Sequence, residues 1–510
     1  MFICLTKEHV LDQSSLPSFY LTTAIDYPNG LPHIGHAYEK VVTDCYARWY
    51  TLKGYDVKLT TGTDENGQKL VKSAQEEGTE TLKFVDKNVI EFRKLCKDLN
   101  LSYTDFIRST EQRHLHQVYK IWNALKETDN IYMDRYKGHY CISCESFYTE
   151  TQFENNLCPV HHTELTYMEE DGYFFRLGKY KEWIIKYINE HPNFIYPFSI
   201  RKEILSRLES DDLNDLSISR PNNGWGIPVP DNDEHVIYTW FDALICYYSS
   251  SQVDEKNQER GHLQFWPADV HVIGKDISWF HTVIWPTMLK CAGIELPKQI
   301  FVHGMVLGHD GKRMSKSLGN GVSPQECLDL VPVDSFRFYM LKSISSGQDG
   351  PFSKEKLVST HNTELANDFG NLLMRVIKLS LKNIGASIAA SDEIDFKFQL
   401  FDKISKEMEE REHHKAITSI FSAIGELNAY LNKTEPWKIK DDKKLFHKIM
   451  YTSLINLNQI SYLLVPFIPD SANKALVALG CKNGTFENGF ENATFELMDL
   501  KPLFPKIDPL

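Results

Sequence analysis

Two histidines, His33 and His36, flank an Ile-Gly pair directly after the turn-forming run Tyr27–Pro32. Apolar residues then recur with a helical period, which predicts that both histidines lie in the first turn of a helix. Such a turn has unpaired N–H groups and favours phosphate, and imidazoles can donate to phosphoryl oxygens. Gly35 would let a phosphate or a flat ring approach the backbone closely. A metal site or an exposed helix start explains His-x-x-His about as well, so this motif alone leaves its chemistry open.

A second segment suited to phosphate chemistry is HDGKRMSKSLGN, residues 309–320, which follows a hydrophobic strand pattern. Its glycines, serines and basic residues are too polar to pack in a core. Lys312, Arg313 and Lys316 would suit a mobile loop that holds a triphosphate. A solvated basic turn fits the same residues, and only the joint occurrence with the two histidines favours phosphate binding.

Three cysteines and a histidine have the spacing of a metal site, C-x2-C-x13-C-x2-H, formed by Cys141, Cys144, Cys158 and His161. Three thiolates and an imidazole match a closed tetrahedral zinc site. Four protein ligands leave no open position for a substrate, so we expect one structural Zn2+ that folds this segment. His162 is the alternative fourth ligand, although the x2 spacing favours His161.

The histidines follow a pattern of strand, loop, helix and strand. Residues 19–25 are rich in β-branched and aromatic residues, a helical period runs from residue 34 to residue 49, and DVKLTTGT at 56–63 alternates as a strand does. This is the opening unit of a doubly wound parallel sheet, which binds ligands beyond the carboxyl ends of its strands. Residues 27–36 and 63–67 are therefore expected to line one crevice.

Changes in pattern along the chain predict an α/β fold with an insertion and a helical end. Short segments around the cysteines interrupt the sheet pattern, strand-like runs resume near residue 236, and the sequence after residue 352 is helical. The expected parts are a Rossmann-like catalytic domain in two halves (1–135 and 236–350), a zinc-bearing insertion (136–235) and an all-α bundle (351–510).

The composition of the 510 residues, 42% hydrophobic and 25% charged, is that of a globular protein with several cores. No apolar run approaches the ~20 residues of a membrane span, and the first sixteen residues contain Glu8 and Asp12 but no arginine, so we expect a cytoplasmic protein. The net charge of −13 disfavours nucleic acid as a general partner but allows a local basic face.

The two signature segments together resemble those of class I aminoacyl-tRNA synthetases. HIGH at His33–His36 and RMSKS at Arg313–Ser317 occur in the order of that class. Arg313 stands where the class usually has a lysine, whereas Lys316 is intact. The chain is most similar to the methionyl-tRNA synthetases, on the stretches AIDYPNGLPHIGHAYE, TGTDENGQK, CISCESFYTE, YTWFDALICYY, VIGKDISWFHTVIWPTML and GNLLMR.

The resemblance implies a site that activates methionine with ATP and Mg2+. Asp64 resembles the carboxylate that pairs with the α-ammonium group of methionine. The methionine pocket would be completed by Ile25, Tyr27, Trp240, Ala243, Leu244, Tyr247 and His281. Leu244 stands where the family often has proline. ATP would be bound by His33, Gly35, His36, Lys275, Asp276 and Lys316, of which His33, His36 and Lys316 would be catalytic.

The resemblance also implies that the helical part reads the anticodon of tRNA(Met) through Asn371, Arg375 and Trp437. Asn371 and Arg375 lie four residues apart, so they face the same side of a helix. Without the resemblance, they would form an ordinary polar helix face. The chain is expected to be a monomer that acts on L-methionine, ATP and tRNA(Met).

Other functions fit the sequence less well. Synthetases for isoleucine, valine and leucine have a much larger hydrolytic insertion, and a cysteinyl enzyme would place a cysteine after the first strand. A nucleotidyltransferase with only the HIGH motif would not need the helical part. A non-catalytic relative is expected to have lost active-site residues, whereas His33, His36, Asp64, Asp276 and Lys316 are all present.

Overall fold

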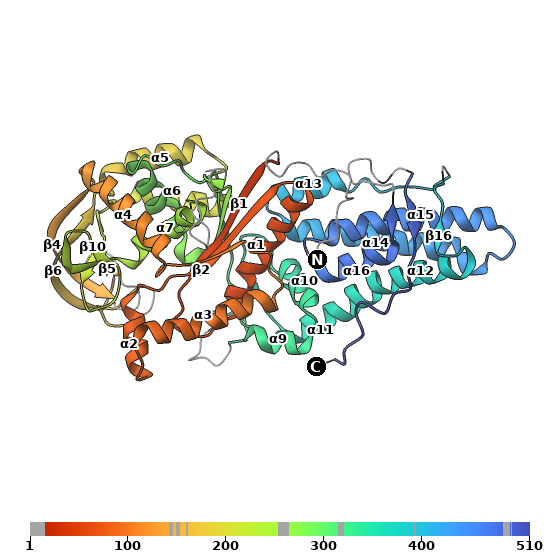
Figure 1. The fold of residues 1–510 in the computed structure, drawn as a ribbon, viewed down its shortest axis with the longest axis horizontal. Coiled ribbons are helices and arrows are strands. Elements are labelled where there is room, and N and C mark those ends of the chain that lie inside the picture. The colour runs from red at the N-terminus through yellow and green to blue at the C-terminus, as the bar shows by residue number, and fades with distance from the viewer. Residues whose placement is uncertain are drawn as a thin grey trace.

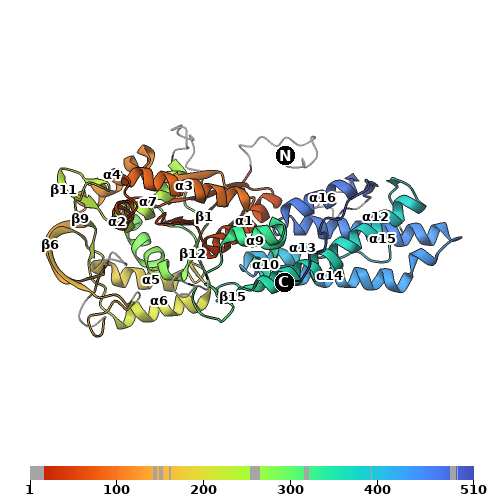
Figure 2. The same ribbon diagram turned by 90° about the horizontal axis from the view of Figure 1, so that it is seen from below.

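The computed structural model describes residues 16–141, 146–148, 153–159, 162–252, 265–314, 321–391, 393–482, 490 and 492–509. The molecule is elongated, with an α/β part at one end and a helical bundle at the other (Figures 1 and 2).

A six-stranded parallel sheet forms the centre of the α/β part, in the order β3-β2-β1-β12-β13-β7. The first three strands follow one another outwards from β1, and the chain then returns to add β12 on the other side of β1. The sheet order therefore reverses between β1 and β12. The strands are β1 (Ser18–Asp26), β2 (Asp56–Thr63), β3 (Asp105–Arg108), β7 (Ile195–Tyr196), β12 (Val270–Gly274) and β13 (Ile300–His303).

Side chains alternate between two cores on the faces of this sheet. Val272 and Phe301 belong to a core shared with the bundle, whereas their neighbours Ile273 and Val302 belong to a core on the opposite face. Buried strands of a parallel sheet are apolar on both faces for this reason. The α/β helices are α1 (Ile34–Leu52), α2 (Gln68–Glu76), α3 (Thr81–Asp98), α4 (Gln112–Glu127), α5 (Lys181–Glu190), α6 (Phe198–Ser210), α7 (Thr239–Gln252), α8 (Trp285–Cys291), α9 (Pro324–Leu330) and α10 (Val333–Ser343).

Two antiparallel sheets lie between the halves of the parallel sheet in sequence. β4 pairs with β6 from Ile131 opposite Phe175 to Tyr140 opposite Thr166, within the sheet β5-β4-β6-β8. A second sheet has the order β10-β11-β9. Their strands are β4 (Ile131–Cys141), β5 (Ser146–Tyr148), β6 (Thr166–Phe175), β8 (Leu216–Ser217), β9 (Ser219–Pro221), β10 (Pro228–Val229) and β11 (Asn232–Ile237).

The C-terminal part is helical and shares a continuous apolar core with α1 and the parallel sheet. Its helices are α11 (Lys354–Thr360), the π-helical η7 (His361–Gly370), α12 (Asn371–Asn383), α13 (Phe401–Glu409), α14 (His413–Thr434), η8 (Pro436–Lys438), α15 (Lys443–Leu464) and α16 (Pro469–Leu479). A small antiparallel sheet joins β16 (Ser387–Ile388), β18 (Thr494–Glu496) and β17 (Cys481–Lys482). In the part of the chain that the structure describes, no helix has the length and apolarity needed to cross a bilayer. The parallel α/β sheet and the helical end agree with the fold class expected from the sequence.

Candidate active site

The carboxyl ends of four parallel strands meet at one edge of the sheet. Asp26, Thr63, Gly274 and His303 end β1, β2, β12 and β13. The strand order reverses at β1 and β12, and open α/β sheets bind ligands at such a switch point. The crevice expected from the sequence therefore lies where the residues that follow these strands come together.

The two histidines of the HIGH motif form a capping box at the N-terminus of α1. His33 is the N-cap residue, and its Nδ1 accepts a hydrogen bond from the backbone N–H of Gly35 at 3.1 Å. The backbone N–H of His33 donates to Nδ1 of His36 at 3.1 Å. The two rings stack with their centroids 3.8 Å apart. A Cβ on Gly35 would lie 3.0 Å from the His33 ring, so glycine there makes room for this stacking.

These contacts fix the proton positions on both imidazoles. Because each Nδ1 accepts from a backbone N–H, the proton of each neutral ring is on Nε2. Burial lowers the pKa of His33, and burial followed by the proximity of His33 and Lys40 lowers the pKa of His36 well below its ordinary value. At pH 7 both rings are neutral and each has an Nε2–H, which can donate to a phosphoryl oxygen without taking its charge.

An acidic group lies across the crevice, at the end of β2. Asp64 is 5% exposed, its backbone N–H donates to the carbonyl of Asp26 at 2.8 Å, and Thr239 Oγ1 contacts both carboxylate oxygens at 2.8 and 2.9 Å. Asp242, one turn further along α7, accepts from Asn66 Nδ2 at 2.6 Å. Burial and the nearby Asp64 carboxylate raise the pKa of Asp242 well above its ordinary value. This shift disfavours the ionised form of Asp242, whereas Asp64 is held by Thr239 directly after β2, where it is suited to a cation.

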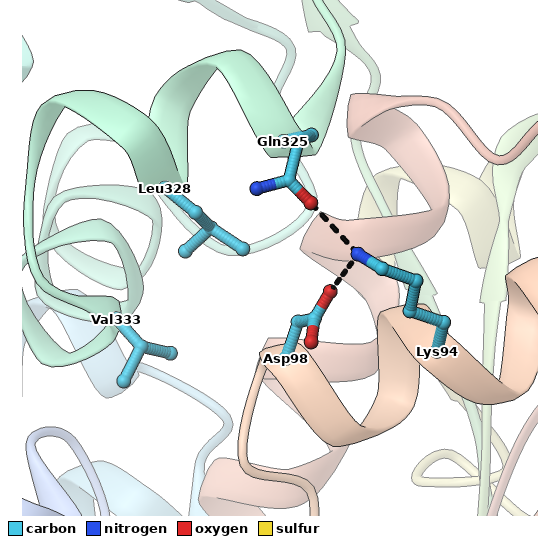
Figure 3. Close-up of a pocket in the computed structure, with 5 residues that line it drawn as sticks. All are labelled: Lys94, Asp98, Gln325, Leu328 and Val333. Carbon is cyan, nitrogen blue, oxygen red and sulfur yellow. Dashed lines mark hydrogen bonds and ion pairs between the residues drawn. The ribbon is translucent and has the colours of Figure 1, made fainter.

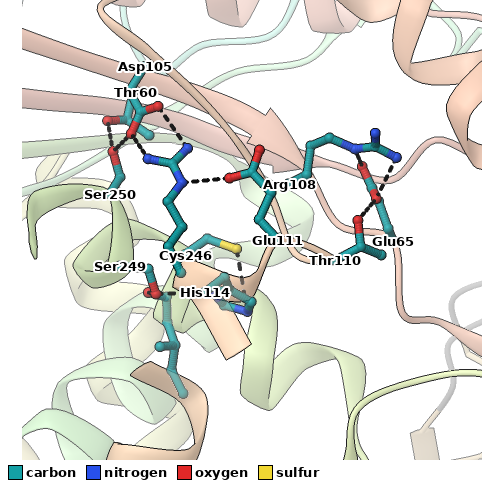
Figure 4. Close-up of polar contacts among 12 residues, drawn as sticks. Thr60, Glu65, Asp105, Arg108, Thr110, Glu111, His114, Cys246, Ser249 and Ser250 are labelled. Carbon is teal, nitrogen blue, oxygen red and sulfur yellow. Dashed lines mark hydrogen bonds and ion pairs between the residues drawn. The ribbon is translucent and has the colours of Figure 1, made fainter. Parts of the chain in front are cut away.

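The loop that carries Asp64 is braced from several sides (Figure 4). Glu65 accepts from Arg108 Nε at 2.8 Å and from Thr110 Oγ1 at 2.5 Å. Arg113 makes two bonds of 2.9 Å to Asp105 in β3, which also accepts from Ser250 of α7. These contacts tie the end of β2 to β3, and β3 to α7, next to Asp64.

Aromatic residues of α7 and of the segment after β12 form the apolar side of the crevice. Trp240 stacks on Phe280 with the ring centroids 4.0 Å apart. Tyr247 OH is 2.7 Å from His281 Nε2, and His281 Nδ1 donates to the carbonyl of Ile277 at 2.9 Å. Nε2 is therefore the acceptor for Tyr247, and burial lowers the pKa of His281 to about 4.

The predicted pocket residues divide between the wall of the crevice and the core behind it. Tyr27 packs against Gly67, where a Cβ would come within 2.1 Å of its hydroxyl oxygen. Ile25, Tyr27 and Trp240 are half-buried, whereas Ala243, Leu244, Tyr247 and His281 are buried.

Two of the residues expected to bind ATP, Lys275 and Asp276, lie directly after β12. Lys275 Nζ is 2.8 Å from Asp349 Oδ1, so this lysine is held by an ion pair. Asp276 is exposed, and its Oδ2 is 3.9 Å from Arg313 Nη2. Arg313 of the second signature motif thus faces the aspartate after β12. Lys316 lies outside the described residues.

Two paired groups at the same edge were not expected from the sequence. Glu39 Oε2 is 3.0 Å from His303 Nε2, and Glu39 Oε1 accepts from the backbone N–H of Ala24 at 2.9 Å. Burial lowers the pKa of His303, but the bond to Glu39 outweighs burial, and the pKa is raised. The only sequence signal was the position of His303 at the end of a predicted strand. Asp26 and Lys40, also missed, form a buried ion pair between β1 and α1.

Two of the four predicted zinc ligands lie in the described part of the insertion. Cys141 and Cys158 are fully buried, form no disulfide and share a small cluster with Leu165. Cys144 and His161 lie outside the described residues. Among the residues that the structure describes, no group of three or more histidine, cysteine or acidic side chains could hold a metal ion. Two buried thiols in one cluster suit the chemistry of half a zinc site.

At the far end, the bundle brings two of the three predicted anticodon residues together. The Arg375 guanidinium lies 5.4 Å from the centroid of the Trp437 ring, and its Nη2 is 3.5 Å from Asn432 Oδ1. Trp437 is 44% exposed, although tryptophan is usually buried. Asn371 is exposed at the start of α12.

A shallow pocket of about 270 Å³ between α3 and α9 lies apart from these residues (Figure 3). Lys94 Nζ donates to Asp98 at 2.5 Å and to Gln325 at 2.8 Å, so the polar groups of the pocket satisfy one another. The bond between Lys94 and Gln325 links α3 to α9 in the second half of the α/β part. Among the residues drawn in Figure 3, the pocket offers no unpaired polar group to a ligand.

Comparison with known proteins identifies both parts of the chain. The family model described as tRNA synthetases class I (M) matches residues 19–169 and 150–377, and the anticodon binding domain of methionyl tRNA ligase matches residues 386–502. The methionine–tRNA ligase of Clostridium perfringens is 40% identical over 96% of this chain and 78% of its own length. That of Bacillus subtilis is 38% identical, with the same coverage of both chains.

Solved structures give the same result. The Mycobacterium tuberculosis methionyl-tRNA synthetase in complex with methionyl-adenylate has a TM-score of 0.90 and 34% identity, over 96% of this chain and all of that one. Its apo form has a TM-score of 0.84 and 32% identity, over 97% of this chain and 99% of that one. The chain belongs to the methionyl-tRNA synthetase family of class I aminoacyl-tRNA synthetases and is an ATP-dependent methionine–tRNA ligase.

Proposed function

We propose that adenylate formation takes place at the switch point of the parallel sheet, between the HIGH histidines and Asp64. A carboxylate oxygen of methionine attacks the α-phosphorus of ATP, the bond to the bridging oxygen breaks, and pyrophosphate leaves. The 3′-terminal ribose of tRNA(Met) then takes the methionyl group, and AMP is released. The protein contributes positioning and charge stabilisation, and no covalent enzyme intermediate is needed.

The observation that supports this proposal best is the matching tautomer of the two histidines. His33 and His36 are both neutral, and each has its proton on Nε2. Two neutral donors at a helix N-terminus stabilise the negative charge that grows on the phosphoryl oxygens. Lys316 is proposed as the cation that closes on the phosphates from the second motif. Mg2+ accompanies ATP and neutralises part of the phosphate charge when bound.

Methionine binds across the crevice from the phosphates in this proposal. The Asp64 carboxylate, held by Thr239, accepts the α-ammonium group. The thioether side chain lies against the half-buried aromatic rings of Tyr27 and Trp240, a surface that suits polarizable sulfur. The pocket consists of Ile25, Tyr27, Trp240, Ala243, Leu244, Tyr247 and His281.

The nucleoside end of ATP is assigned to the segment after β12. The exposed Asp276 carboxylate suits the two ribose hydroxyls, as at other nucleotide-binding strand ends. Lys275 is directed to the phosphates, and its ion pair with Asp349 would have to open for this. Gly35 keeps the start of α1 compact around the His33 ring.

The remaining parts are proposed to serve the tRNA. Residues 1–135 and 236–350 form the catalytic domain, residues 136–235 the connective insertion, and residues 351–510 the anticodon-binding domain. In the insertion, one structural Zn2+ would be held by Cys141, Cys144, Cys158 and His161, and it would fix the fold of that segment when bound. In the bundle, Trp437 stacks on an unpaired base, and Asn371 and Arg375 bond to base edges.

ATP–pyrophosphate exchange tests the site. His36→Asn removes the Nε2 donor, and we expect a loss of about 100-fold or more in kcat with little change in the methionine KM. An exchange rate equal to that of the wild type would exclude the role given to His36. When all twenty amino acids are screened in the same assay, we expect methionine to have the highest kcat/KM. A higher kcat/KM for another amino acid would overturn the proposed methionine pocket.

A further inference from the structure

Lys40 and Asp26 form an ion pair behind the HIGH histidines, and neither residue has a step in the proposed reaction. The side chain of Lys40, on α1, is 0% exposed, and that of Asp26, the last residue of β1, is 3% exposed. Lysine and aspartate are almost never buried without a partner. Burial keeps the Lys40 ammonium group away from any substrate, so whatever it does for the reaction it does through another residue.

The Asp26 carboxylate lies between two side chains of α1. Its Oδ2 accepts from Lys40 Nζ, and its Oδ1 is 3.9 Å from Nε2 of His36. His36 and Lys40 are one turn apart and therefore share a face of the helix. Burial raises the pKa of Asp26 to about 6, although Lys40 opposes this rise, so the carboxylate is ionised at pH 7.

The nitrogen nearest to Asp26 is the one that carries the His36 proton. Since Nδ1 of His36 accepts from the backbone N–H of His33, the proton is on Nε2. The distance of 3.9 Å is beyond a hydrogen bond, so this proton is not taken by the carboxylate. An Asp26 carboxyl oxygen released from Lys40 would be the nearest side-chain acceptor for it.

Other groups hold the His36 ring in place from its remaining sides. The His33 ring stacks on it, and Phe92 of α3 meets it edge-on with the centroids 5.2 Å apart. Burial, the proximity of His33 and the charge of Lys40 lower the pKa of His36, and Lys40 is the charged group besides Asp26 that acts on it among the described residues. The ring is therefore fixed, and the variable is the distance between its Nε2–H and the Asp26 carboxylate.

We propose that Lys40 is a positioning residue for adenylate formation. Its ammonium group holds the Asp26 carboxylate beyond hydrogen-bonding distance of His36, so that the His36 Nε2–H remains available to the phosphates of ATP. The inference rests on the phosphate-binding role proposed above for His36.

The test compares four variants in ATP–pyrophosphate exchange. Lys40→Met removes the charge but keeps the length, and we expect kcat to fall about 10-fold or more while the methionine KM stays within about twofold. Lys40→Arg keeps the charge and should recover most of kcat. Asp26→Asn combined with Lys40→Met removes the carboxylate as well and should also recover it. Lys83→Met, at an exposed lysine of α3 paired with Glu80, is the matched control with wild-type kinetics.

A second readout separates positioning from a general loss of structure. The 15N chemical shifts of the His36 ring report its protonation. We expect a neutral ring with its proton on Nε2 in every folded variant, and a downfield shift of the Nε2–H proton in Lys40→Met relative to the wild type and the double variant, because there this proton is donated to Asp26. A Lys40→Met variant with wild-type kcat, or with the Nε2–H chemical shift of the wild type, would overturn the proposal.

The double variant remains informative if Lys40→Met does not fold. A folded double variant that is as slow as His36→Asn would show that the ammonium group acts by itself, which contradicts the proposal. His36→Asn also separates the two levels of the argument. If it exchanges at the wild-type rate, the role of His36 is wrong; if it is slow while folded Lys40→Met is not, only the role of Lys40 is wrong.

Discussion

Replacing Arg337 by methionine should destabilise the junction between the catalytic part and the bundle. Arg337 of α10 is fully buried, and its Nη2 is 2.6 Å from Asp44 Oδ2 in α1. It also donates to the carbonyls of Leu99 at 3.1 Å and Pro466 at 3.2 Å. Methionine keeps the apolar stem of the side chain but has no donors, so the variant leaves a buried carboxylate and two carbonyls with fewer partners.

The size of the effect follows from the environment of Asp44. Burial raises its pKa, but Arg48 and Arg337 outweigh burial and hold the pKa at about 2. A difference of nearly two units from the ordinary value corresponds to about 2 kcal/mol of stability at pH 7. Breaking a buried pair costs about 3–5 kcal/mol, and Asp44 keeps Arg48 and Ser102, so we expect the lower end, about 3 kcal/mol.

Thermal unfolding followed by circular dichroism measures this loss. With an unfolding entropy of about 2.1 cal/mol/K per residue, 3 kcal/mol lowers Tm by about 3 °C if all 510 residues unfold together. The shift is about twice as large if only half of the chain unfolds as a unit.

The control is Arg135→Met, at an exposed arginine 3.7 Å from Asp171, because exposed ion pairs contribute little to stability. A Tm for Arg337→Met equal to that of the control would refute the reasoning.

Three further predictions concern the pocket, the insertion and pH. His281→Phe removes the acceptor of Tyr247 OH, and we expect the methionine KM to rise about 10-fold with an unchanged ATP KM in pyrophosphate exchange; equal changes in both would contradict the pocket. Metal analysis should find one zinc per chain and less in Cys158→Ser, and a zinc-free active enzyme would exclude the structural site. Burial lowers the pKa of His114 to about 3 and of His281 to about 4. Their contribution to the free energy of unfolding is therefore complete above the ordinary histidine pKa and decreases as the pH falls below it. The urea concentration at the midpoint of unfolding should therefore be lower at pH 5.5 than at pH 7, by the equivalent of about 1 kcal/mol per buried histidine. The difference between the two pH values should be smaller in His114→Asn.

The local elements of the catalytic part could be predicted from the sequence because their patterns are local. The first strand was expected at residues 19–25 and runs from Ser18 to Asp26, and DVKLTTGT is the whole of β2. The helix that begins at Ile34 was expected from its apolar period, and the histidines lie at its first turn. Parallel topology follows from these elements, since their short connections and right-handed crossovers leave few arrangements.

Contacts between distant segments could not be predicted in the same way. The pairing of Glu39 with His303 and the cation–π contact of Arg375 with Trp437 join residues far apart in the sequence, and no periodicity refers one partner to the other. Charged residues in a helical pattern are usually assigned to an exposed face. That expectation fails for α1, because the sheet covers one side of this helix and the bundle covers another.

The burial of α1 explains why its charges matter for the active site. From Ala37 to Tyr50 every residue of α1 is buried, so an apolar face alone cannot fix how the helix is rotated about its axis. The buried charged residues of α1 can fix this rotation, because each of them is paired with a different element. Glu39 pairs with β13, Lys40 with β1, Asp44 with α10, and Arg48 donates to the carbonyl of Asn100 after α3. A rotation of one residue would separate all these pairs at once, at a cost of several kcal/mol for each buried charge. The ion pairs along α1 therefore fix the direction in which the histidines at its N-terminus face.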